Sequence, residues 1–380
     1  MKRKISVTTG TRAEYGLLRP ILNEIKKNPN LELILIVTGM HLSKKHGNTI
    51  DIIKKEGFKI SSKFEMIPKK DEPYDMATTL GHGIINFSKI FKKMKPDINL
   101  ILGDRDEVFA SAIAASHMNI PNAHIHGGDK TKGNIDEYIR HAITKISNIH
   151  FAVSKQSMER IIQMGENPSH VFFTGSPGID EIKNGKISTK NTLEKKYGIK
   201  FTGNEILLLQ HPVTSQHKES EKQIISTLTA ISNLNHNTIA IYPNSDAGNK
   251  KIIKQLEKFS KNFTFIHLFP SIPREDYLGM LKNCGVLVGN SSSGMIECSY
   301  FDTHVVNIGI RQQGREHGKN VTNVKEFVSS KIESAIKKSL NSKPKKISRI
   351  YGNGNSTKKI VKVLENIPLN KKLLQKQITY

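Results

Sequence analysis

Short apolar runs alternate with helix-length segments along the whole chain, and this alternation constrains the fold more than any other feature. A strand, a helix and then another strand is the pattern of a parallel sheet with helices on both faces. We expect strands at Ile5–Thr8, Leu33–Val37, Asn99–Leu102, His124–Ile125, His150–Val153, Val171–Phe173, Ile206–Leu209, Thr238–Ile241, Thr264–Leu268, Val286–Val288 and Val305–Ile308. The sequence therefore predicts an α/β fold built from doubly wound parallel sheets.

The expected strands fall into two groups, and the 380 residues are enough for two domains. Gly175–Gly178 interrupts the alternation, and a polar stretch rich in Lys and Asn follows it to Gly203. We expect a Rossmann-like domain over residues 1–177 and a second one over residues 178–360. Residues 361–380 form a polar, basic tail, which is either frayed or a helix that docks on the first domain.

Composition narrows the class of protein. Hydrophobic residues make up 37% of the chain and charged residues 24%, as in soluble globular proteins. Apolar runs stay well below the roughly 18 to 20 residues of a membrane span, and Met1–Lys4 leads into a strand without a signal-peptide pattern. We expect a cytoplasmic protein without a membrane partner, in which Cys284 and Cys298 are buried thiols.

The formal net charge of +24 fits three kinds of partner: nucleic acid, an anionic membrane face or an acidic small substrate. The excess lysines are dispersed, aromatic residues make up only 6% of the chain, and no nucleic-acid-binding motif is present. We therefore expect a solvated lysine-rich surface and no nucleic-acid partner. Such a surface can still steer a nucleotide toward its site.

A serine-rich turn, Gly289–Gly294, follows the strand expected at Val286–Val288. Free N–H groups at a helix start, together with serine hydroxyls, can surround a phosphate, and glycine lets the backbone approach it. The alternative is that these serines only cap a helix. The turn alone does not decide between the two interpretations.

Nearly every expected strand is followed directly by a short polar segment, which we call a polar exit. Ligands of open parallel sheets bind beyond the carboxyl ends of the strands, where these exits lie. Eight such exits on two sheets favour a ligand held between the two domains. Those of the second half, with Asn244, Ser291, Ser292 and Arg311, supply donors for phosphates and a nucleoside. Those of the first half supply titratable groups for proton transfer, namely His41, Asp104, His126, Asp129, Asp136 and Glu137. Paired acids beside a diphosphate also suit Mg²⁺, which remains the alternative.

Several motifs follow one another over nearly the whole chain, namely Gly10–Tyr15, Gly103–Arg105, His124–Asp129, Ile139–Lys145, Gln210–Thr214, Gly289–Gly294 with Glu297, Arg311–Arg315 and Tyr351–Asn355. Together they resemble the motifs of the hydrolysing UDP-N-acetylglucosamine 2-epimerases. The resemblance implies two Rossmann-like domains of the glycosyltransferase-B type, the second of which binds UDP. It also implies a dimer or tetramer that needs neither NAD nor metal.

The implied reaction converts UDP-N-acetylglucosamine and water into UDP and N-acetylmannosamine, through a 2-acetamidoglucal, for sialic-acid-type sugar synthesis. The family's diphosphate and uridine positions match Arg12, Ala13, Arg105, His211, Asn244, Ser291, Ser292, Glu297 and Arg311. Its acid/base positions match Asp104 and the pair Asp136–Glu137. The chain departs from the family at His126, where some members carry glutamate, and at Asp129, where glutamate is usual.

The chemistry explains why such residues are needed. A C2 proton on an unactivated sugar is weakly acidic, so cleavage of the C1–O bond must run ahead and the leaving diphosphate must be bound strongly. A carboxylate such as Asp104 can balance the developing positive charge or take a proton, and a second carboxylate can activate water. His211 either contacts the diphosphate or sugar or serves as a cap.

Other activities fit the same residues. The substrate is either UDP-N-acetylglucosamine or a UDP-2,4-diacetamido-2,4,6-trideoxy sugar of a legionaminic-type pathway. A UDP-sugar glycosyltransferase would share the fold and the UDP site but would need an acceptor. A non-hydrolysing epimerase would return UDP-N-acetylmannosamine, and a basic nucleic-acid-binding protein would show no turnover.

Overall fold

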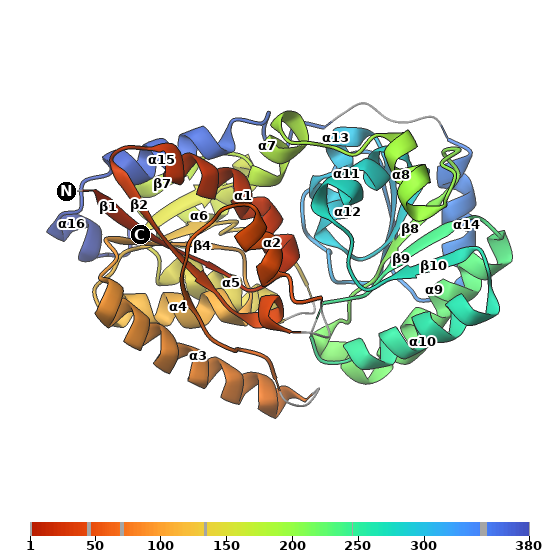
Figure 1. Ribbon diagram of the computed structural model, residues 1–380, viewed down its shortest axis with the longest axis horizontal. Helices are drawn as coiled ribbons and strands as arrows, with labels where there is room; N and C mark the ends of the chain where they lie inside the picture. Colours follow the sequence, from red (N-terminus) through yellow and green to blue (C-terminus); the bar gives the residue numbers. More distant parts are fainter. Residues whose placement is uncertain are drawn as a thin grey trace. The chain divides into compact units, whose positions relative to one another are not determined.

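The computed structural model describes residues 2–43, 47–68, 72–132, 135–244, 246–342 and 348–379, and it divides into two compact units (Figure 1). Unit 1 comprises residues 1–129, 136–183 and 351–380, and unit 2 comprises residues 130–135 and 184–350. This division differs from the expected one, because residues 178–183 and 351–360 belong to unit 1 and residues 130–135 to unit 2.

Unit 1 contains a seven-stranded sheet in the order β3-β2-β1-β4-β5-β6-β7, and every neighbouring pair of strands is parallel. The strands are β1 Arg3–Thr9, β2 Leu31–Val37, β3 Ile60–Lys63, β4 Ile98–Leu102, β5 Asn122–Ile125, β6 Ile149–Ala152 and β7 Val171–Phe173. The α-helices are α1 Arg12–Lys27, α2 Ile50–Lys55, α3 Pro73–Met94, α4 Asp106–His117, α5 Ile135–Lys145, α6 Lys155–Gln163, α7 Pro177–Asn184, α15 Ser356–Asn366 and α16 Lys371–Leu374. Short 3₁₀ turns lie at Gly39–Leu42 and Pro168–His170.

Helices cover the sheet of unit 1 through apolar contacts. On one face, Phe87 and Phe91 of α3 pack with Ile34 and Ile36 of β2. The same layer continues through α4 to α5, where Ile139 and Ile143 pack with Ile101 of β4. Burial of these side chains stabilises the unit by roughly 1.5–3 kcal/mol each. The layer also fixes α5, which carries Asp136, Glu137 and Arg140 of the candidate site.

Unit 2 contains a six-stranded parallel sheet in the order β10-β9-β8-β11-β12-β13. The strands are β8 Ile206–Leu209, β9 Thr238–Ile241, β10 Ile266–Phe269, β11 Val286–Gly289, β12 His304–Ile308 and β13 Val321–Val324. The α-helices are α8 Lys190–Tyr197, α9 Ser220–Leu234, α10 Asn249–Asn262, α11 Arg274–Asn283, α12 Ser292–Ile296, α13 Cys298–Phe301 and α14 Ser329–Leu340. A 3₁₀ segment covers Thr214–Glu219.

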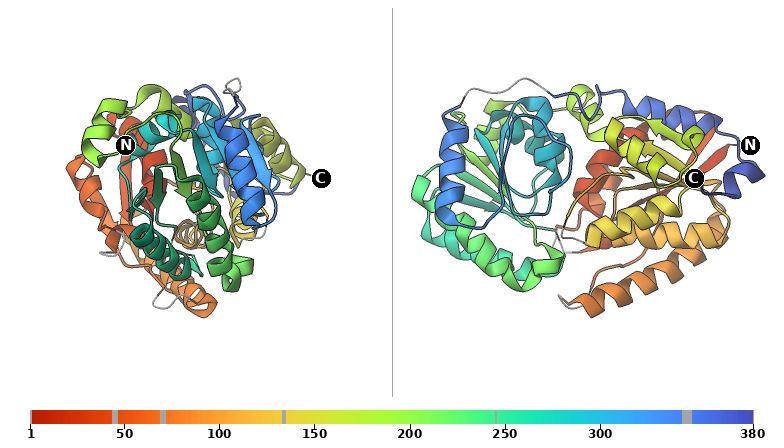
Figure 2. Two further views of the ribbon diagram at one scale, coloured as in Figure 1. Left: turned by 90° about the vertical axis from the view of Figure 1, so that its right-hand side faces the viewer. Right: turned by 180° about the vertical axis from the view of Figure 1, so that it is seen from behind.

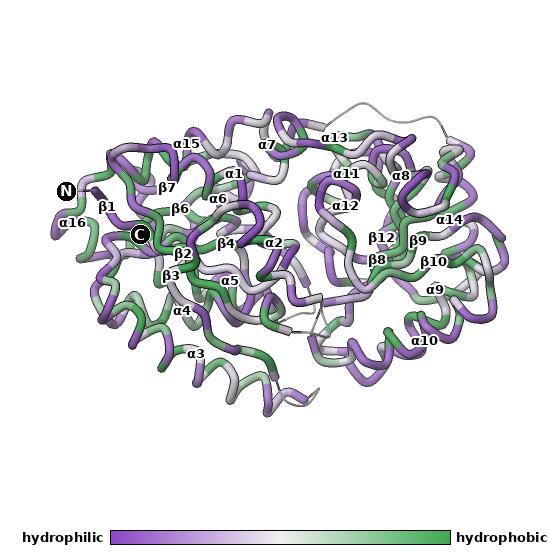
Figure 3. The backbone as a smooth tube through the Cα atoms, viewed as in Figure 1, coloured by the Kyte–Doolittle hydropathy of each residue, from purple (hydrophilic) through white to green (hydrophobic). Residues whose placement is uncertain are grey.

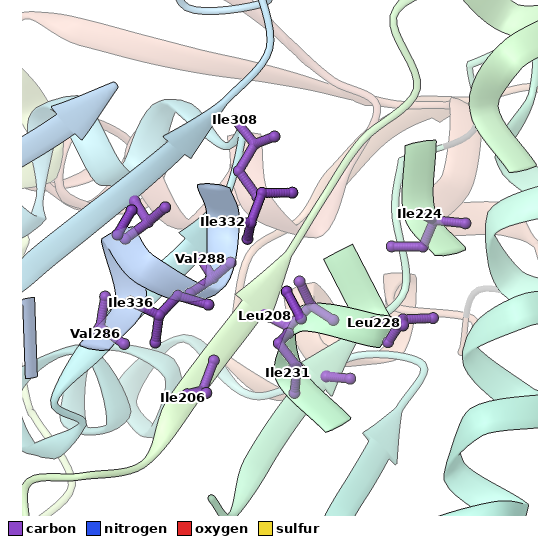
Figure 4. Close-up of a cluster of buried hydrophobic side chains, with 14 of the residues drawn as sticks. Ile206, Leu208, Ile224, Leu228, Ile231, Val286, Val288, Ile308, Ile332 and Ile336 are labelled. Atoms are coloured by element: carbon purple, nitrogen blue, oxygen red, sulfur yellow. The ribbon is translucent and has the colours of Figure 1, made fainter. Parts of the chain in front are cut away.

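The core of unit 2 lies where α9 and α14 meet the sheet (Figure 4). Ile224, Leu228 and Ile231 lie on one side of α9 and pack with Leu208 of β8. Hydropathy follows this layering, because the strands are apolar while the outer side of α10 is hydrophilic (Figure 3). Buried strands with apolar residues on both faces are typical of parallel sheets covered on both sides.

The expected fold class is confirmed: both units are parallel-sheet α/β folds, and every expected strand is present within a few residues. The expectation missed β3 and β13, which occupy edges of the two sheets. Their sequences, Ile-Ser-Ser-Lys and Val-Thr-Asn-Val, are too polar to stand out as buried strands. No helix in the described ranges is long and apolar enough to cross a membrane.

The chain returns to unit 1 after unit 2 and is fixed there by α15, which packs beside α1 (Figures 1 and 2). The N-cap residue of α15, Asn355, makes no side-chain cap. Asp180 of α7 takes its place, since its Oδ1 accepts the backbone N–H of Ser356 at 2.9 Å and its Oδ2 that of Thr357 at 2.6 Å. The Asp180 side chain thus caps a helix that lies 176 residues further along the chain.

We expect Asp180→Ala to lower the free energy of unfolding by about 1–3 kcal/mol, because it leaves two buried N–H groups without an acceptor. Asp180→Asn keeps one carbonyl acceptor and should lose less. Denaturant unfolding of the three proteins measures the difference. Equal stability of Asp180→Ala and the unchanged protein would show that water caps α15 as well as the carboxylate does.

Candidate functional site

The strand order of each sheet reverses at one place, and ligands of doubly wound sheets bind at such switch points. In unit 1, β1 lies between β2 and β4, so the turns after β1 and β4 leave the sheet at its switch point. In unit 2, β8 lies between β9 and β11, which places the turns after β8 and β11 in the same position. The polar exits that the sequence singled out include all four of these turns.

Arg140 of α5 organises the acidic residues of unit 1. Its side chain is 1% exposed, and it donates from Nε to Oδ2 of Asp104 at 2.8 Å. Its Nη2 donates to the same oxygen, and its Nη1 donates to Oε2 of Glu137 at 2.6 Å and to the carbonyl of Asp129 at 3.0 Å. One buried cation therefore joins residues that follow β4 and β5 to the first turn of α5.

The charges in this cluster stabilise one another. Burial alone would lower the pKa of Arg140, but the nearby carboxylates of Asp104, Asp129 and Glu137 raise it above its ordinary value. The guanidinium therefore stays charged, and it favours the ionised form of each acid. The side chains of Asp104 and Glu137 are 22% and 21% exposed, so both carboxylates remain within reach of a ligand.

Asp129 holds His126 in a strained turn after β5. His126 has φ +71°, a left-handed conformation that is uncommon outside glycine. Its Nδ1 lies 3.1 Å from Oδ2 of Asp129, and its Nε2 lies 3.3 Å from Oγ of Ser176. The other Asp129 oxygen, Oδ1, accepts from Oγ of Ser157 at 2.7 Å. Both Asp129 and His126 are buried, so Asp129 serves this turn while Asp104 and Glu137 remain partly exposed.

The remaining expected residues of unit 1 lie at helix starts. Arg12 and Ala13 open α1, and Arg105 is the N-cap residue of α4. Asp136 is half-buried in the first turn of α5, next to Glu137. Asp136 thus stands beside Glu137, and Arg140 joins Glu137 to Asp104 and Asp129. The expected acids of the first half therefore gather at the carboxyl edge of the sheet.

His41 does not act as the titratable group that was expected. It is fully buried, and its Nε2 and Nδ1 lie 3.1 Å from Oγ1 of Thr9 and 2.7 Å from Oγ1 of Thr49. Burial lowers the pKa of His41 to about 4, so the ring is neutral near pH 7. Its two hydrogen bonds join the turn after β2 to the end of β1 and to the start of α2.

Asn290 joins the turns of unit 2. Its Oδ1 accepts the backbone N–H of His211 at 2.7 Å, and its Nδ2 donates to the His211 carbonyl at 2.9 Å. The carbonyl of Asn290 accepts from Nη1 of Arg311 at 3.3 Å and from Nε2 of Gln312 at 3.1 Å. The preceding Gly289 has φ +132°, and a Cβ there would collide with the carbonyl of Leu209. The turns after β8, β11 and β12 therefore form one hydrogen-bonded group.

The tautomer of His211 follows from its neighbour. The backbone N–H of Asn244 donates to Nδ1 of His211 at 3.0 Å. The neutral ring must then carry its proton on Nε2, which makes that atom a donor. The Asn244 side chain is held in turn, since its Nδ2 donates to Oδ2 of Asp246 at 2.6 Å. A donor at this strand end suits an anionic ligand.

The serine turn opens a short helix and holds a buried acid. Ser291 is the N-cap of α12, and its Oγ accepts the backbone N–H of Ser293 at 3.3 Å. Ser292 is the first residue of α12, which is only five residues long, so the helix dipole is weaker than the sequence suggested. Glu297 is 3% exposed, and it accepts hydrogen bonds from Nη2 of Arg274 and from Oγ of Ser293.

Arg140, Asn290 and Arg274 are the residues to which the sequence assigned no role. Arg140 follows Glu137 by one helical turn, a spacing at which opposite charges meet on a helix. Asn290 stands directly after a strand-ending glycine. No sequence pattern pointed to Arg274, because it lies in α11 and its partner Glu297 follows a different helix, α12.

Comparisons with known proteins show the family of the chain. The family model described as UDP-N-acetylglucosamine 2-epimerase matches residues 23–365. "UDP-N,N'-diacetylbacillosamine 2-epimerase (hydrolyzing)" of Legionella pneumophila is 37% identical over 380 residues, 100% of both chains. "Polysialic acid biosynthesis protein P7" of Escherichia coli is 39% identical over 325 residues, 85% of this chain and 82% of that protein.

A solved structure shows the same fold. It is the crystal structure of the UDP-GlcNAc 2-epimerase of Methanocaldococcus jannaschii in complex with UDP-GlcNAc and UDP, with a TM-score of 0.80. The likeness covers 95% of this chain and 99% of that one at 20% identity, which establishes the two-domain glycosyltransferase-B-like fold. The chain therefore belongs to the UDP-N-acetylglucosamine 2-epimerase family, as a UDP-sugar 2-epimerase of the hydrolysing kind.

Proposed function

We propose that this protein converts UDP-N-acetylglucosamine and water into N-acetylmannosamine and UDP, for sialic-acid-type sugar synthesis. The observation that carries the proposal is the pair of partly exposed carboxylates, Asp104 and Glu137, held on the buried guanidinium of Arg140. One carboxylate of such a pair can remove a proton from the substrate, and the other can deliver a proton later in the reaction. The family match and the name of the polysialic acid relative support the same activity.

The proposed reaction has two balanced stages. Loss of the C2 proton and of UDP leaves 2-acetamidoglucal, with a double bond between C1 and C2. Water then adds across this bond, so that the hydroxyl joins C1 and a proton joins C2 on the face opposite to the one it left. We assign these proton transfers to Asp104 and Glu137, with Asp136 beside them and Asp129 fixing the adjoining turn.

We assign binding of the UDP leaving group to donors at the strand ends. His211, whose Nε2 is a donor, and Arg311 suit the diphosphate, and their turns share Asn290. The full proposed set, for the diphosphate and the uridine together, is Arg12, Ala13, Arg105, His211, Asn244, Ser291, Ser292, Glu297 and Arg311. Tight binding of the departing diphosphate lowers the barrier to C1–O cleavage.

A second sugar is favoured by one specific observation. The Legionella pneumophila relative, which matches over its full length, is named for UDP-N,N'-diacetylbacillosamine. This UDP-2,4-diacetamido-2,4,6-trideoxy sugar carries the same 2-acetamido group, so the same chemistry applies to it. The two candidate substrates differ only at C4 and C6, away from the bonds that change.

The proposal is tested by incubating the purified protein with UDP-N-acetylglucosamine and no acceptor. We expect equal amounts of UDP and N-acetylmannosamine, measured by chromatography. UDP-N-acetylmannosamine as the end product would identify a non-hydrolysing epimerase, and no release until an acceptor is added would identify a glycosyltransferase. Turnover of the diacetamido sugar alone would move the assignment to the second candidate.

We expect Arg311→Ala to weaken UDP binding by about 1.5–3 kcal/mol, the usual contribution of a hydrogen bond to a charged group. Isothermal titration calorimetry with UDP measures the change in Kd. Lys331→Ala is the matched control, since Lys331 is a 59% exposed cation of α14 that pairs with Glu326. Equal UDP affinity in Arg311→Ala and the unchanged protein would remove Arg311 from the binding set.

A further inference from the structure

Two buried carboxyl groups that the proposed reaction does not use flank the turn after β1. Glu14 of α1 is 6% exposed and Glu107 of α4 is 4% exposed. Oε2 of Glu14 accepts the backbone N–H of Gly10 at 2.6 Å. On the other side, a Cβ built on Gly10 would lie 2.8 Å from Oε1 of Glu107, and one on Gly39 would collide with the same oxygen. Both carboxyl groups therefore lie next to Gly10.

The partners of the two acids differ. Glu107 has a cationic partner, because Nε of Arg105 donates to its Oε2 at 3.2 Å. Glu14 has no such partner in a direct hydrogen bond: its Oε2 accepts a backbone N–H, and its Oε1 is buried without a hydrogen-bond partner among the described residues. A buried carboxylate oxygen without a donor is unfavourable, whereas a buried carboxyl hydroxyl can donate to a neighbouring carboxylate. Glu14 is thus the member of the pair that suits a proton.

Titratable and charged side chains from three neighbouring segments lie near the pair. Arg105, at the start of α4, interacts with both acids, and Arg12 opens α1 two residues before Glu14. From the turn after β2 comes His41, which is neutral near pH 7 because burial lowers its pKa to about 4. Arg105 therefore lies close to both acids, and loss of one proton makes the charge beside it more negative by one unit.

We propose that Glu14 and Glu107 share one proton, and that this proton controls how strongly Arg105 attracts an anion. With the proton present, the pair carries one negative charge beside Arg105. When the proton is lost, the pair carries two negative charges, which weaken the attraction of Arg105 for an anion. The part of this inference that concerns UDP rests on the proposed function, in which Arg12 and Arg105 contact the nucleotide.

The direction of the pH effect follows from the electrostatics. Burial first, and then the charge of Glu107, raise the pKa of Glu14 to about 8. The proton is therefore bound near pH 7 and is lost as the pH rises through about 8. Because an anionic ligand favours the protonated pair, affinity is fully present below this range and decreases above it.

The protonation itself can be measured without a ligand. Infrared spectroscopy of the intact protein, titrated from about pH 6 to about pH 10, reports the carboxylic-acid C=O stretching band. We expect one such band to disappear near pH 8 and to be absent from Glu14→Gln at every pH. Glu107→Gln should shift its midpoint to lower pH, because the charge of Glu107 no longer opposes ionisation of Glu14. A spectrum without a protonated carboxyl near neutral pH would overturn the shared proton.

The consequence for binding is measured by calorimetry with UDP at about pH 7 and about pH 9.5. At an effective dielectric constant of about 20, one unit charge about 12 Å from a unit negative charge on the ligand changes Kd about ten-fold. Between about pH 7 and about pH 9.5 we expect Kd to rise about ten-fold in the unchanged protein and less than about two-fold in Glu14→Gln. These changes are counted beyond any change that the ionisation of UDP itself causes in both proteins. Titration in two buffers of different ionisation enthalpy should show proton uptake on binding near pH 8 only when Glu14 is present.

The outcomes separate the two claims. Equal pH dependence of UDP binding in the unchanged protein and Glu14→Gln, with the infrared band present, would overturn control of binding by the pair. A protein that fails to bind UDP at any pH would overturn the proposed function and with it this role, while the infrared titration would still decide whether the proton is shared. If Glu14→Gln does not fold, the infrared midpoint of Glu107→Gln, compared with that of the unchanged protein, decides whether the two acids share a proton.

Discussion

Asp104→Asn is expected to lower kcat by about a thousand-fold, in the middle of the range for loss of an acid/base group. The amide keeps an oxygen that can accept from Nε and Nη2 of Arg140, so the local structure should persist. It cannot take a proton from C2 or balance a developing positive charge. Because this interaction is needed only in the transition state, kcat and kcat/KM should fall together, as steady-state kinetics of UDP release will show.

The control for this variant is its affinity for UDP. Asp104 is not among the proposed diphosphate donors, so calorimetry should give an unchanged Kd. Near-normal turnover with normal UDP affinity would remove Asp104 from the reaction. A large loss of UDP affinity would instead make it a binding residue.

Arg140→Met is expected to lower the free energy of unfolding by about 3–5 kcal/mol, the usual effect of removing one partner of a buried ion pair. Asp104 and Glu137 then lose the cation that both contact, and the Asp129 carbonyl loses its donor. Mutual repulsion should raise the pKa of one carboxyl and leave it protonated near pH 7. We therefore also expect a fall in kcat of at least about a hundred-fold.

Two variants make this experiment specific. Arg140→Lys keeps the charge, but one ammonium group cannot reproduce the planar set of donors, so its activity should stay well below normal. Lys92→Met removes an exposed cation from α3 and should change stability by less than about 0.5 kcal/mol. Denaturant unfolding compares all of them. Normal stability and turnover in Arg140→Met would contradict the organising role of the guanidinium.

The sequence could predict the two sheets because a buried parallel strand is apolar on both faces and stands out between polar segments. Ile98–Leu102 and Val286–Gly289 show this clearly. The edge strands Ile60–Lys63 and Val321–Val324 pair on one side only and carry polar residues, so the same criterion misses them. The division into units also differed at residues 351–360, which belong to unit 1; Asp180 caps the helix that begins there, a contact that no local pattern encodes.

The polar strand ends were predictable for a related reason, since the carboxyl ends of parallel strands gather at one edge of a sheet. The side chains that hold them were not. Arg274 reaches Glu297 from another helix, and Asn290 bridges two turns that are 79 residues apart in the chain. His41 looked titratable in the sequence, yet its complete burial makes it neutral. Residue type and spacing thus identify candidates, whereas burial and partners decide their protonation.

The most direct test of the proposed chemistry is proton NMR of the purified protein with UDP-N-acetylglucosamine in D₂O. If the C2 proton leaves together with UDP and a solvent proton returns on the other face, the released N-acetylmannosamine will carry deuterium at C2, in step with UDP. N-acetylmannosamine or any other released sugar that retains its original C2 proton would contradict this account.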